Sequence, residues 1–473
     1  MTDAPTESPA AEPAAPLERP RPARPARRRP TDLTFELPDD VRALGSALGE
    51  HAWLQADREI ARAAFLSLPV ESNQLYTPYI DLRAADLADI VAYGAPAFEP
   101  AADARTDVPP DVDGIIEFTE DRITALALSP AAREAGVALE AAGSALRREP
   151  DLVRALIDGG GDLPEDDKLA QLTRAAWNQG PVLRVPDGVV LQRPIVIRWI
   201  LGRPRRALFA RTLISLGRGA RASVVEELVA AEGLPFGGGQ ALYGGTTEVF
   251  LETGADLSVA SVQELGPDQI AFQHRASSIG DGANLRLALA QLGGRLVRSR
   301  VDNRLVGDRS SVEQVEIVFG AGSQLFDLTS YTRHIGRDTT GDLLSKGALL
   351  DASRSYMKGL ITIERSARGT DSFLGEFGMN LSKQARAVAI PSLEIDQPDC
   401  RRAMHSSSVG PIDEGQLFYL ESRGIPPEDA RKFIVLGFLE PVVARVPLEA
   451  VRERLRDLLD EKWVAGTAGA AAA

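Results

Sequence analysis

A run of short strands punctuated by glycine, from Val182 to Ile395, constrains the fold more than any other feature of the sequence. Apolar and polar residues alternate along it, and no convincing helix interrupts it. A string of Gly, Ala and alternating apolar residues recurs in it, clearly or in looser form, beginning at Gly219, Gly254, Gly282, Gly307 and Gly322. The spacing, roughly 15 to 35 residues, is within the range typical of solenoid proteins.

This repeat predicts a parallel β-helix. Each repeated glycine is expected at a corner with positive φ, a conformation that glycine adopts without steric cost. The alternating residues that follow would then point into a stacked core. A β-sandwich is the alternative, but the run contains no clear Asn-Gly hairpin turn. We therefore expect a mainly β protein with a right-handed parallel β-helix core.

Helical periodicity is found on both sides of this run. The upstream segments expected to be helical are Asp40–Trp53, Gln55–Leu68, Ser129–Arg148, Pro150–Ile157 and Glu165–Trp177. The downstream ones are Asp413–Gly424, a segment that begins at Pro426, and Leu448–Trp463. The open ends of a β-helix must be covered, so these helical domains are expected to cap the solenoid.

The sequence is therefore divided into five segments. They are a disordered leader rich in Pro, Ala and Arg (1–30), an N-terminal helical domain (31–180), the β-helix core (181–410), a C-terminal helical domain (411–463) and a disordered tail (464–473). The arginines of the leader leave a second interpretation open, a basic arm for RNA or an anionic partner.

Composition excludes several classes of protein. The net charge of −14 argues against a general nucleic-acid binder. There is no run of about 18 apolar residues and no secretory pattern at the start, so neither a membrane span nor secretion is expected, and a cytoplasmic location follows. No glycine-rich loop precedes a Lys-Ser or Lys-Thr pair, so the chain is not expected to bind ATP itself.

Cysteine count limits the metal chemistry. Cys400 is the only cysteine, which excludes a disulfide within the chain. One cysteine also cannot build a tetrahedral Cys-rich metal or cluster site alone. A cluster held by this protein must therefore take most of its ligands from another subunit or from bound thiols.

Five strings, in order along the chain, carry a family resemblance. The most specific is Leu-Phe-Tyr-Leu-Glu-Ser-Arg-Gly-Ile at 417–425, and the others lie at 185–195, 391–395, 405–410 and 428–432. Together they resemble the SufB/SufD family of the SUF iron–sulfur cluster assembly system, from about Ala176 to Trp463. The N-terminal part departs from the family because the Trp-Arg pair of a family motif is missing near Asn73–Pro78.

The resemblance implies a scaffold role rather than an enzyme. Proteins of this family pair SufB with SufD through their β-helices, and each binds a SufC ATPase through C-terminal helices. ATP hydrolysis belongs to the SufC-like partner, and a nascent iron–sulfur cluster is held transiently between subunits. The lack of a second cysteine favours the SufD-like branch, because SufB-like chains carry a cysteine that receives sulfur. Whether the chain forms a homodimer without its partner is left open.

The resemblance also implies a site. His405 aligns with a histidine implicated in holding the nascent cluster, and neutral imidazole can ligate iron. The alternative is an ordinary histidine ahead of a helix. Cys400 lies five residues earlier, whereas better-known SufD sequences have a cysteine at the position of Ala403. Its thiolate would be a soft ligand, but an incidental buried thiol fits equally.

The C-terminal helices are the expected surface for the SufC-like ATPase. The candidate contact residues are Phe418, Tyr419, Arg423, Phe433 and Phe438, although packing onto the solenoid would explain an aromatic residue there as well.

The remaining ionisable candidates lack ligand spacing. They are expected on solvated faces or turns, and they are His51, His274, His334, Glu394, Asp396 and Asp399.

Two other functions fit a β-helix. One is a polysaccharide-active enzyme, although such enzymes are usually secreted and use charged clusters in a groove. The other is a structural β-solenoid without a role in cluster assembly.

Overall fold

The computed structural model describes residues 28–37, 50–94, 99–158, 163–233 and 238–471. Most of the leader (1–27) and most of the helix expected at 40–53 lie outside these ranges. The helices are α2 (Ala52–Ser67), the short 3₁₀ helix η1 (Thr77–Tyr79), α3 (Pro130–Glu134), α4 (Ala142–Arg148), α5 (Pro150–Asp158), α6 (Lys168–Ala176), α7 (Glu414–Ser422), α8 (Pro427–Val443) and α9 (Glu449–Ala471). None of the helices in the described ranges is both long enough and apolar enough to cross a membrane.

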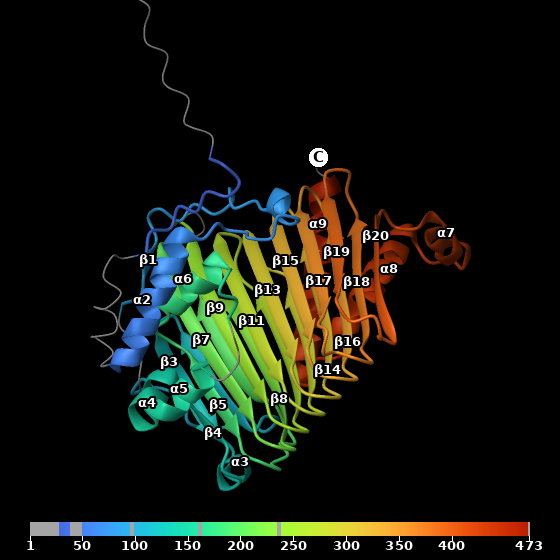
Figure 1. Cartoon of the computed structure of the whole chain (residues 1–473). Coiled ribbons are helices and arrows are strands. Elements are labelled where there is room, and N and C mark those ends of the chain that lie inside the picture. The colour runs from blue at the N-terminus through green and yellow to red at the C-terminus, as the bar shows by residue number, and fades with distance from the viewer. Residues whose placement is uncertain (1–27, 38–49, 95–98, 159–162, 234–237, 472–473) are drawn as a thin grey trace, which may run out of the picture.

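Two sheets form the centre of the molecule (Figure 1). Each takes its name from the numbers of its solenoid strands, although β4 joins the odd-numbered sheet and β3 joins the even-numbered sheet. The odd-numbered sheet contains β1 (Val91–Ala92), β4 (Ala138–Ala141), β5 (Pro181–Val185), β7 (Arg206–Leu216), β9 (Ala241–Leu251), β11 (Gln269–Ile279), β13 (Leu296–Leu305), β15 (Leu325–His334), β17 (Arg354–Ile363) and β19 (Arg386–Ile395). The even-numbered sheet contains β2 (Gly114–Thr119), β3 (Arg122–Leu128), β6 (Ile195–Leu201), β8 (Arg221–Ala230), β10 (Asp256–Glu264), β12 (Asn284–Gln291), β14 (Ser311–Gly320), β16 (Thr340–Leu349), β18 (Asp371–Asn380) and β20 (Arg402–Gly410).

The chain winds through these sheets as a parallel solenoid. From β5 and β6 onward, each turn places one strand in each sheet, and each strand pairs in parallel with its equivalent in the next turn. The two sheets face each other, and their inward side chains form a continuous apolar core. The predicted parallel β-helix with helices on both sides is confirmed.

One corner of the solenoid shows why the glycines repeat. The residues with positive φ in this column are Gly188, Gly219, Gly254, Gly282, Arg309, Asp338 and Gly369. Each donates its backbone N–H to a carbonyl of the next turn, for example Gly254 to Asp281 at 2.8 Å and Arg309 to Arg337 at 2.7 Å. The expectation for Gly307 was wrong, because Arg309 takes the left-handed conformation there, with φ 58°. A Cβ at Gly307 would instead lie 2.0 Å from the backbone N of Asp281.

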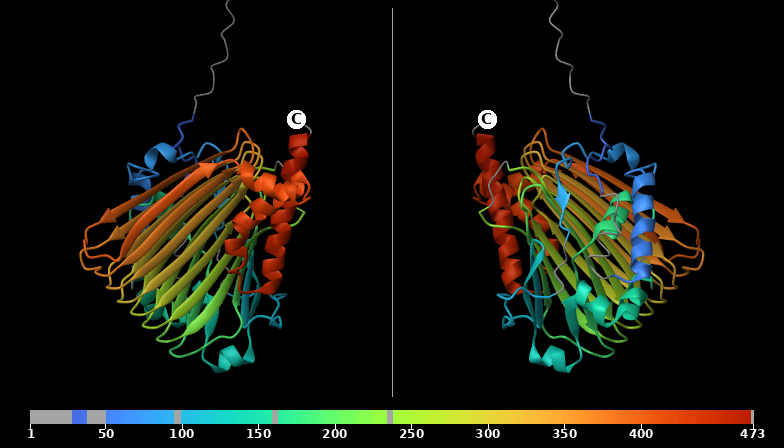
Figure 2. Two further views of the ribbon diagram at one scale, coloured as in Figure 1. Left: turned by 90° about the vertical axis from the view of Figure 1, so that its right-hand side faces the viewer. Right: turned by 90° about the vertical axis from the view of Figure 1, so that its left-hand side faces the viewer.

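The N-terminal segments cover the outer face of the odd-numbered sheet (Figure 2). Asp167 caps α6 and also accepts from His274 of β11, with Nε2 to Oδ1 at 3.0 Å. Arg298 and Arg300 of β13 lie 3.4 and 3.3 Å from the other carboxylate oxygen of Asp167. Burial alone would raise the pKa of Asp167, but His274, Arg298 and Arg300 hold it well below its usual value. This buried cluster ties the N-terminal cover to the sheet.

Two histidines expected on solvated turns are in fact buried. His274 belongs to the cluster just described, and His334 lies inside the solenoid between the hydroxyls of Thr339 and Ser372, at 2.8 and 3.0 Å. Burial lowers the pKa of His334 to about 4, so it packs as a neutral ring. The exposure expected for the other ionisable residues is confirmed for His51, Glu394, Asp396 and Asp399.

Strands also occur where only helices were expected. The helix expected over Ser129–Arg148 is wrong, because the chain forms α3, then β4, then α4. Gly136 adopts φ 81° after α3 and ends that helix. β4 then pairs antiparallel with β5, and β3 pairs antiparallel with β2, so the solenoid begins with two added edge strands.

The C-terminal helices cover the outer face of the even-numbered sheet. Apolar residues of α8 and α9, including Val442 and Leu455, pack on outward-facing residues such as Ile317 and Ala348. The tail expected to be disordered is helical as far as Ala471, which follows from the high helix propensity of alanine. By contrast, α7 has no buried residue among those described and projects beyond β20 (Figure 1).

Candidate functional site at the open end of the solenoid

The last turn of the solenoid is not covered as the first turn is. Within the described ranges, β19 pairs only with β17 and β20 pairs only with β18. Apolar side chains are exposed on these strands, among them Met404 with 51% of its surface exposed. Each strand therefore presents a free edge, which in a soluble protein calls for a partner or a protective device.

His405 lies on the inward side of this open turn. It is in register with Leu374 of β18, as Ala403 is with Ser372. Ala403 packs on the buried cluster that contains Leu374, so alternate residues of β20 face inward and His405 is one of them. A Cβ on Gly378 would touch Val409, which confirms the same parity further along β20. His405 is exposed only because no further turn closes over it.

Cys400 is near this site but on a different element. It belongs to the connection between β19 and β20, where it is half-buried against a small apolar cluster shared with Leu393 and Ala403. His405 and Cys400 thus lie at the same end of the solenoid but on different elements, β20 and the connection that precedes it. Across the part of the chain that the structure describes, no group of three or more His, Cys, Asp or Glu side chains forms a metal site.

Glu376 is the residue that sequence reasoning missed. It is 1% exposed, lies on the inward face of β18 and is in register with Ser407 of β20. Its Oε2 accepts the backbone N–H of Ile390 at 2.7 Å. Burial raises the pKa of Glu376 to about 7, although the Ile390 N–H and the charge of Lys358 act to lower it. The alternation of Leu374, Glu376 and Gly378 was the available signal, because it puts the carboxylate on the core face.

The C-terminal candidates separate into two groups. Phe418 and Phe433 are 73% and 66% exposed, and Tyr419 is also exposed, with the Arg423 guanidinium 5.2 Å from its ring centre. Phe438 differs because it is half-buried, 4.7 Å below the Lys346 ammonium. Phe433 and Phe438 both line a cleft of about 470 Å³ between β18, β20 and α8.

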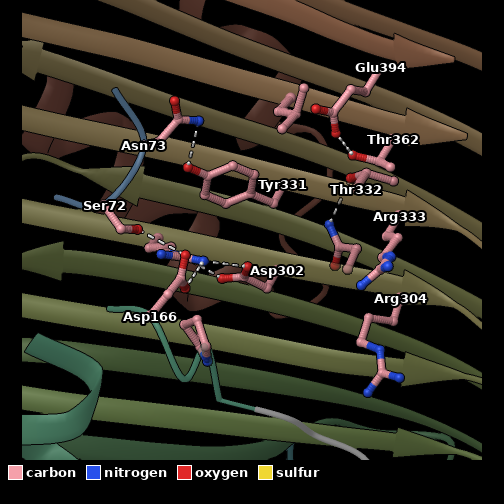
Figure 3. Close-up of a pocket in the computed structure, with 14 residues that line it drawn as sticks. Ser72, Asn73, Asp166, Asp302, Arg304, Tyr331, Thr332, Arg333, Thr362 and Glu394 are labelled. Carbon is pink, nitrogen blue, oxygen red and sulfur yellow. Dashed lines mark hydrogen bonds and ion pairs between the residues drawn. The ribbon is translucent and has the colours of Figure 1, made fainter. Parts of the chain in front are cut away.

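A second cleft, of about 650 Å³, lies on the outer face of the odd-numbered sheet (Figure 3). Among its charged residues, Arg300 contacts Asp302 at 2.8 Å and Asp166 at 3.4 Å. On the side of the cleft formed by the N-terminal segment, the Asn73 amide donates to the Tyr331 hydroxyl, with a distance of 3.5 Å between the two atoms. This cleft opens on the outer face of the odd-numbered sheet, whereas His405 faces inward from β20 of the even-numbered sheet, so the two do not form one site.

Comparison with known proteins identifies the family in which this arrangement occurs. Residues 200–438 match the family described as "SUF system FeS cluster assembly, SufBD core domain", which is half of the chain and includes His405, Cys400, α7 and most of α8. The chain belongs to the SufBD family. Its SufD-like character is supported by the iron–sulfur cluster assembly protein SufD of Bacillus subtilis, 29% identical over 338 residues, which are 71% of this chain and 76% of that protein.

Two further relatives carry the family name. A SufBD family protein of Mycobacterium bovis is 31% identical over 233 residues, 48% of this chain and 58% of the relative. One from Staphylococcus epidermidis is 26% identical over 324 residues, 68% of each. The aligned region thus spans little more than half of the mycobacterial relative.

Proposed function

We propose that this SufD-like chain is a non-catalytic scaffold subunit of a SufBCD-type complex that assembles iron–sulfur clusters. The observation that carries the proposal is the unclosed last turn with His405 on its inward face. A histidine in that position can contribute one ligand to a nascent cluster at the boundary with a second subunit. The single cysteine means that most ligands must come from the partner.

The SufB-like subunit is proposed to dock on β19 and β20. Their free edges offer backbone N–H and C=O groups to added strands, and exposed apolar residues such as Ile395 and Met404 would be buried by the contact. Because these groups are equally available to a second copy of this chain, a homodimer is the expected competitor when the SufB-like partner is absent.

The SufC-like ATPase is proposed to dock on α7 and α8. Phe418, Tyr419 and Phe433 supply exposed aromatic surface there, and Arg423 adds a cation over the Tyr419 ring. Aromatic residues and arginine are the groups that most often dominate protein interfaces. Phe438 supports the position of α8 rather than contacting the ATPase. ATP hydrolysis is assigned to this partner and not to the SufD-like chain.

Cys400 is proposed as a secondary contact at most. Its half-buried place against an apolar cluster leaves His405 as the principal ligand from this chain. A partner that closes over the last turn could still bring cluster sulfide toward the thiol, so Cys400→Ser is expected to lower cluster yield less than His405→Ala does.

The experiment is co-purification with SufB-like and SufC-like partners, followed by anaerobic cluster reconstitution measured by absorbance. His405→Ala should leave the complex intact and lower the cluster yield. His51→Ala, which removes another exposed histidine outside the site, is the matched control and should not change the yield. An unchanged yield in His405→Ala would remove that residue from the site, and failure to form any complex would contradict the scaffold role.

A further inference from the structure

We propose that Glu376 is a second iron-contacting residue of this chain, which presents its carboxylate, together with the His405 imidazole, to a ferrous ion in the open last turn. This inference rests on the proposed scaffold function and names the ion that the open turn receives. Imidazole with carboxylate is a ligand combination found in protein Fe(II) sites. The remaining ligands would be water or groups of the partner subunit.

Strand register brings the two side chains to the same place. His405 is paired with Leu374, and Glu376 is two residues further along β18 on the same inward face. Neighbouring strands lie about 4.8 Å apart and a two-residue step adds about 6.6 Å, so the two Cα atoms are separated by roughly 8 Å. Two long side chains on one face can converge on a single ion across that distance.

The carboxylate is turned toward the last turn. Its Oε2 accepts the N–H of Ile390, which belongs to β19, rather than a donor from a deeper turn. Room for the carboxylate comes from Gly359 of β17, where a Cβ would lie only 2.8 Å from Oε1. A carboxylate oxygen can accept more than one donor, so this arrangement leaves acceptor capacity on Glu376 for a cation.

Three other buried acids in the molecule already have a cation. Glu248 pairs with Arg211 at 2.6 Å, Glu226 with Arg275 at 2.6 Å, and Asp327 with Lys358 at 2.6 Å. Among the ion pairs of the described residues, none includes Glu376. A buried carboxylate without a cation in direct contact is costly to ionise, and a bound ferrous ion would supply that contact.

Glu316 provides a matched control within the same solenoid. It is also buried, takes part in no ion pair within the described ranges, and is linked by register through Ser345 to Glu376. Its Oε1 accepts from the Gln291 amide at 3.1 Å, and its strand β14 lies two turns deeper in the solenoid than β18. The two glutamates share a column of the core, and only Glu376 lies on a strand that pairs with the strand of His405.

The test is anaerobic equilibrium binding of Fe²⁺ to the purified full-length chain. Glu376→Gln and His405→Ala should each weaken binding by about tenfold or more, and Glu316→Gln should leave it within about twofold. The Fe²⁺ affinity of Glu376→Asp should lie between those of wild type and Glu376→Gln, because this variant keeps the carboxylate but shortens the side chain by one methylene. Circular dichroism and thermal midpoints establish that each variant is folded, and Glu376→Asp carries the test if Glu376→Gln is not.

Wild-type affinity in Glu376→Gln would overturn the inference, as would a wild-type chain that binds no Fe²⁺. Neither outcome would contradict the scaffold function, which depends on complex formation and on the effect of His405→Ala on cluster yield. A loss of binding in Glu316→Gln equal to that in Glu376→Gln would also overturn it, because the effect would then belong to any core glutamate.

Discussion

The first and last turns of the solenoid are built from the same kind of strand but end differently. At the first turn, antiparallel β3 and β4 occupy the edges, and the inward residues, such as Trp199, are fully buried. At the last turn, no other strand of the described residues pairs with the outer edges of β19 and β20, and inward residues such as His405 reach solvent. A solenoid must protect its ends, so this difference is the basis for proposing that a partner subunit docks on the last turn.

Buried acids differ in the same way. Asp167, under the N-terminal cover, is surrounded by His274, Arg298 and Arg300, and its pKa lies well below the usual range. Glu376, beneath the open turn, has no such partner within the described ranges, and burial raises its pKa to about 7. The covered region therefore satisfies its charges internally, whereas the open end holds a carboxylate that an external cation could satisfy.

The largest expected effect is at the closed end. Trp199 is 0% exposed and stacks on Phe118 with ring centres 4.3 Å apart. Trp199→Ala should lower the free energy of unfolding by about 3–5 kcal/mol through lost burial and a cavity. The control at the open end is Met404→Ala, which should change it by less than about 0.5 kcal/mol. Equal losses in chemical denaturation would mean that the last turn is packed like the first.

The next largest effect on stability is expected in the buried cluster around Asp167 that ties the N-terminal segments to the sheet. Asp167→Asn keeps an oxygen to cap α6 but leaves Arg298 and Arg300 with one anion fewer, which should cost about 3 kcal/mol. Asp166→Asn is the neighbouring control, since that side chain is 61% exposed, and it should cost less than about 0.5 kcal/mol. Denaturant midpoints at neutral pH measure both.

At acidic pH, Asp167 should no longer stabilise the folded chain. Its pKa in the folded chain is lower than in the unfolded chain, where it is about 3.9. The stabilisation is therefore present above about pH 4 and is lost as the pH falls toward the folded value. The difference in stability between wild type and Asp167→Asn should shrink below pH 4, and a difference that is constant with pH would contradict the ionised state of Asp167.

Glu376 should show the opposite pH dependence. Its folded pKa of about 7 is above the unfolded value of about 4.3, so the folded chain retains a proton that the unfolded chain releases between these values. Wild-type stability should fall by at most about 3 kcal/mol from pH 4.5 to pH 7.5 through this group. Glu376→Gln should lose this component, match wild type near pH 4 and be the more stable protein at pH 8. Parallel pH profiles would show that the carboxyl ionises without cost.

The sequence predicted the solenoid because the backbone conformation at many of its corners depends on the residue found there. A residue with positive φ is most easily glycine, and Gly219, Gly254 and Gly282 show it. The column could not be followed through Arg309 and Asp338, because backbone hydrogen bonds to the next turn hold these residues in the same conformation without a glycine to mark them. Tertiary stacking, which a local pattern does not contain, decided those corners.

The candidate site was predictable only in part. The family strings located His405, but they gave no sign that it lies in a strand and faces inward, which depends on its register with Leu374. Glu376 was missed because burial of a glutamate depends on which strands lie above and below it. Phe418 and Phe433 could not be separated from Phe438 by sequence, since all three are aromatic residues of helices, and only packing against Lys346 distinguishes the last.

The smallest change in stability, and the clearest test of the exposed helices, is expected at Phe433. Because its ring is 66% exposed, Phe433→Ala should change the free energy of unfolding by less than about 0.5 kcal/mol. If α8 is the ATPase surface, the same variant should weaken binding of a SufC-like subunit by about 30-fold, the effect of losing one interface anchor. Phe438→Ala should show the reverse pattern, with lower stability and a smaller change in affinity.

Calorimetric titration with the ATPase and denaturation of the free chain separate these outcomes. Unchanged affinity in Phe433→Ala would move the ATPase contact to α7, where Phe418→Ala would be the next variant, while a large loss of stability would mean that Phe433 packs against the chain itself.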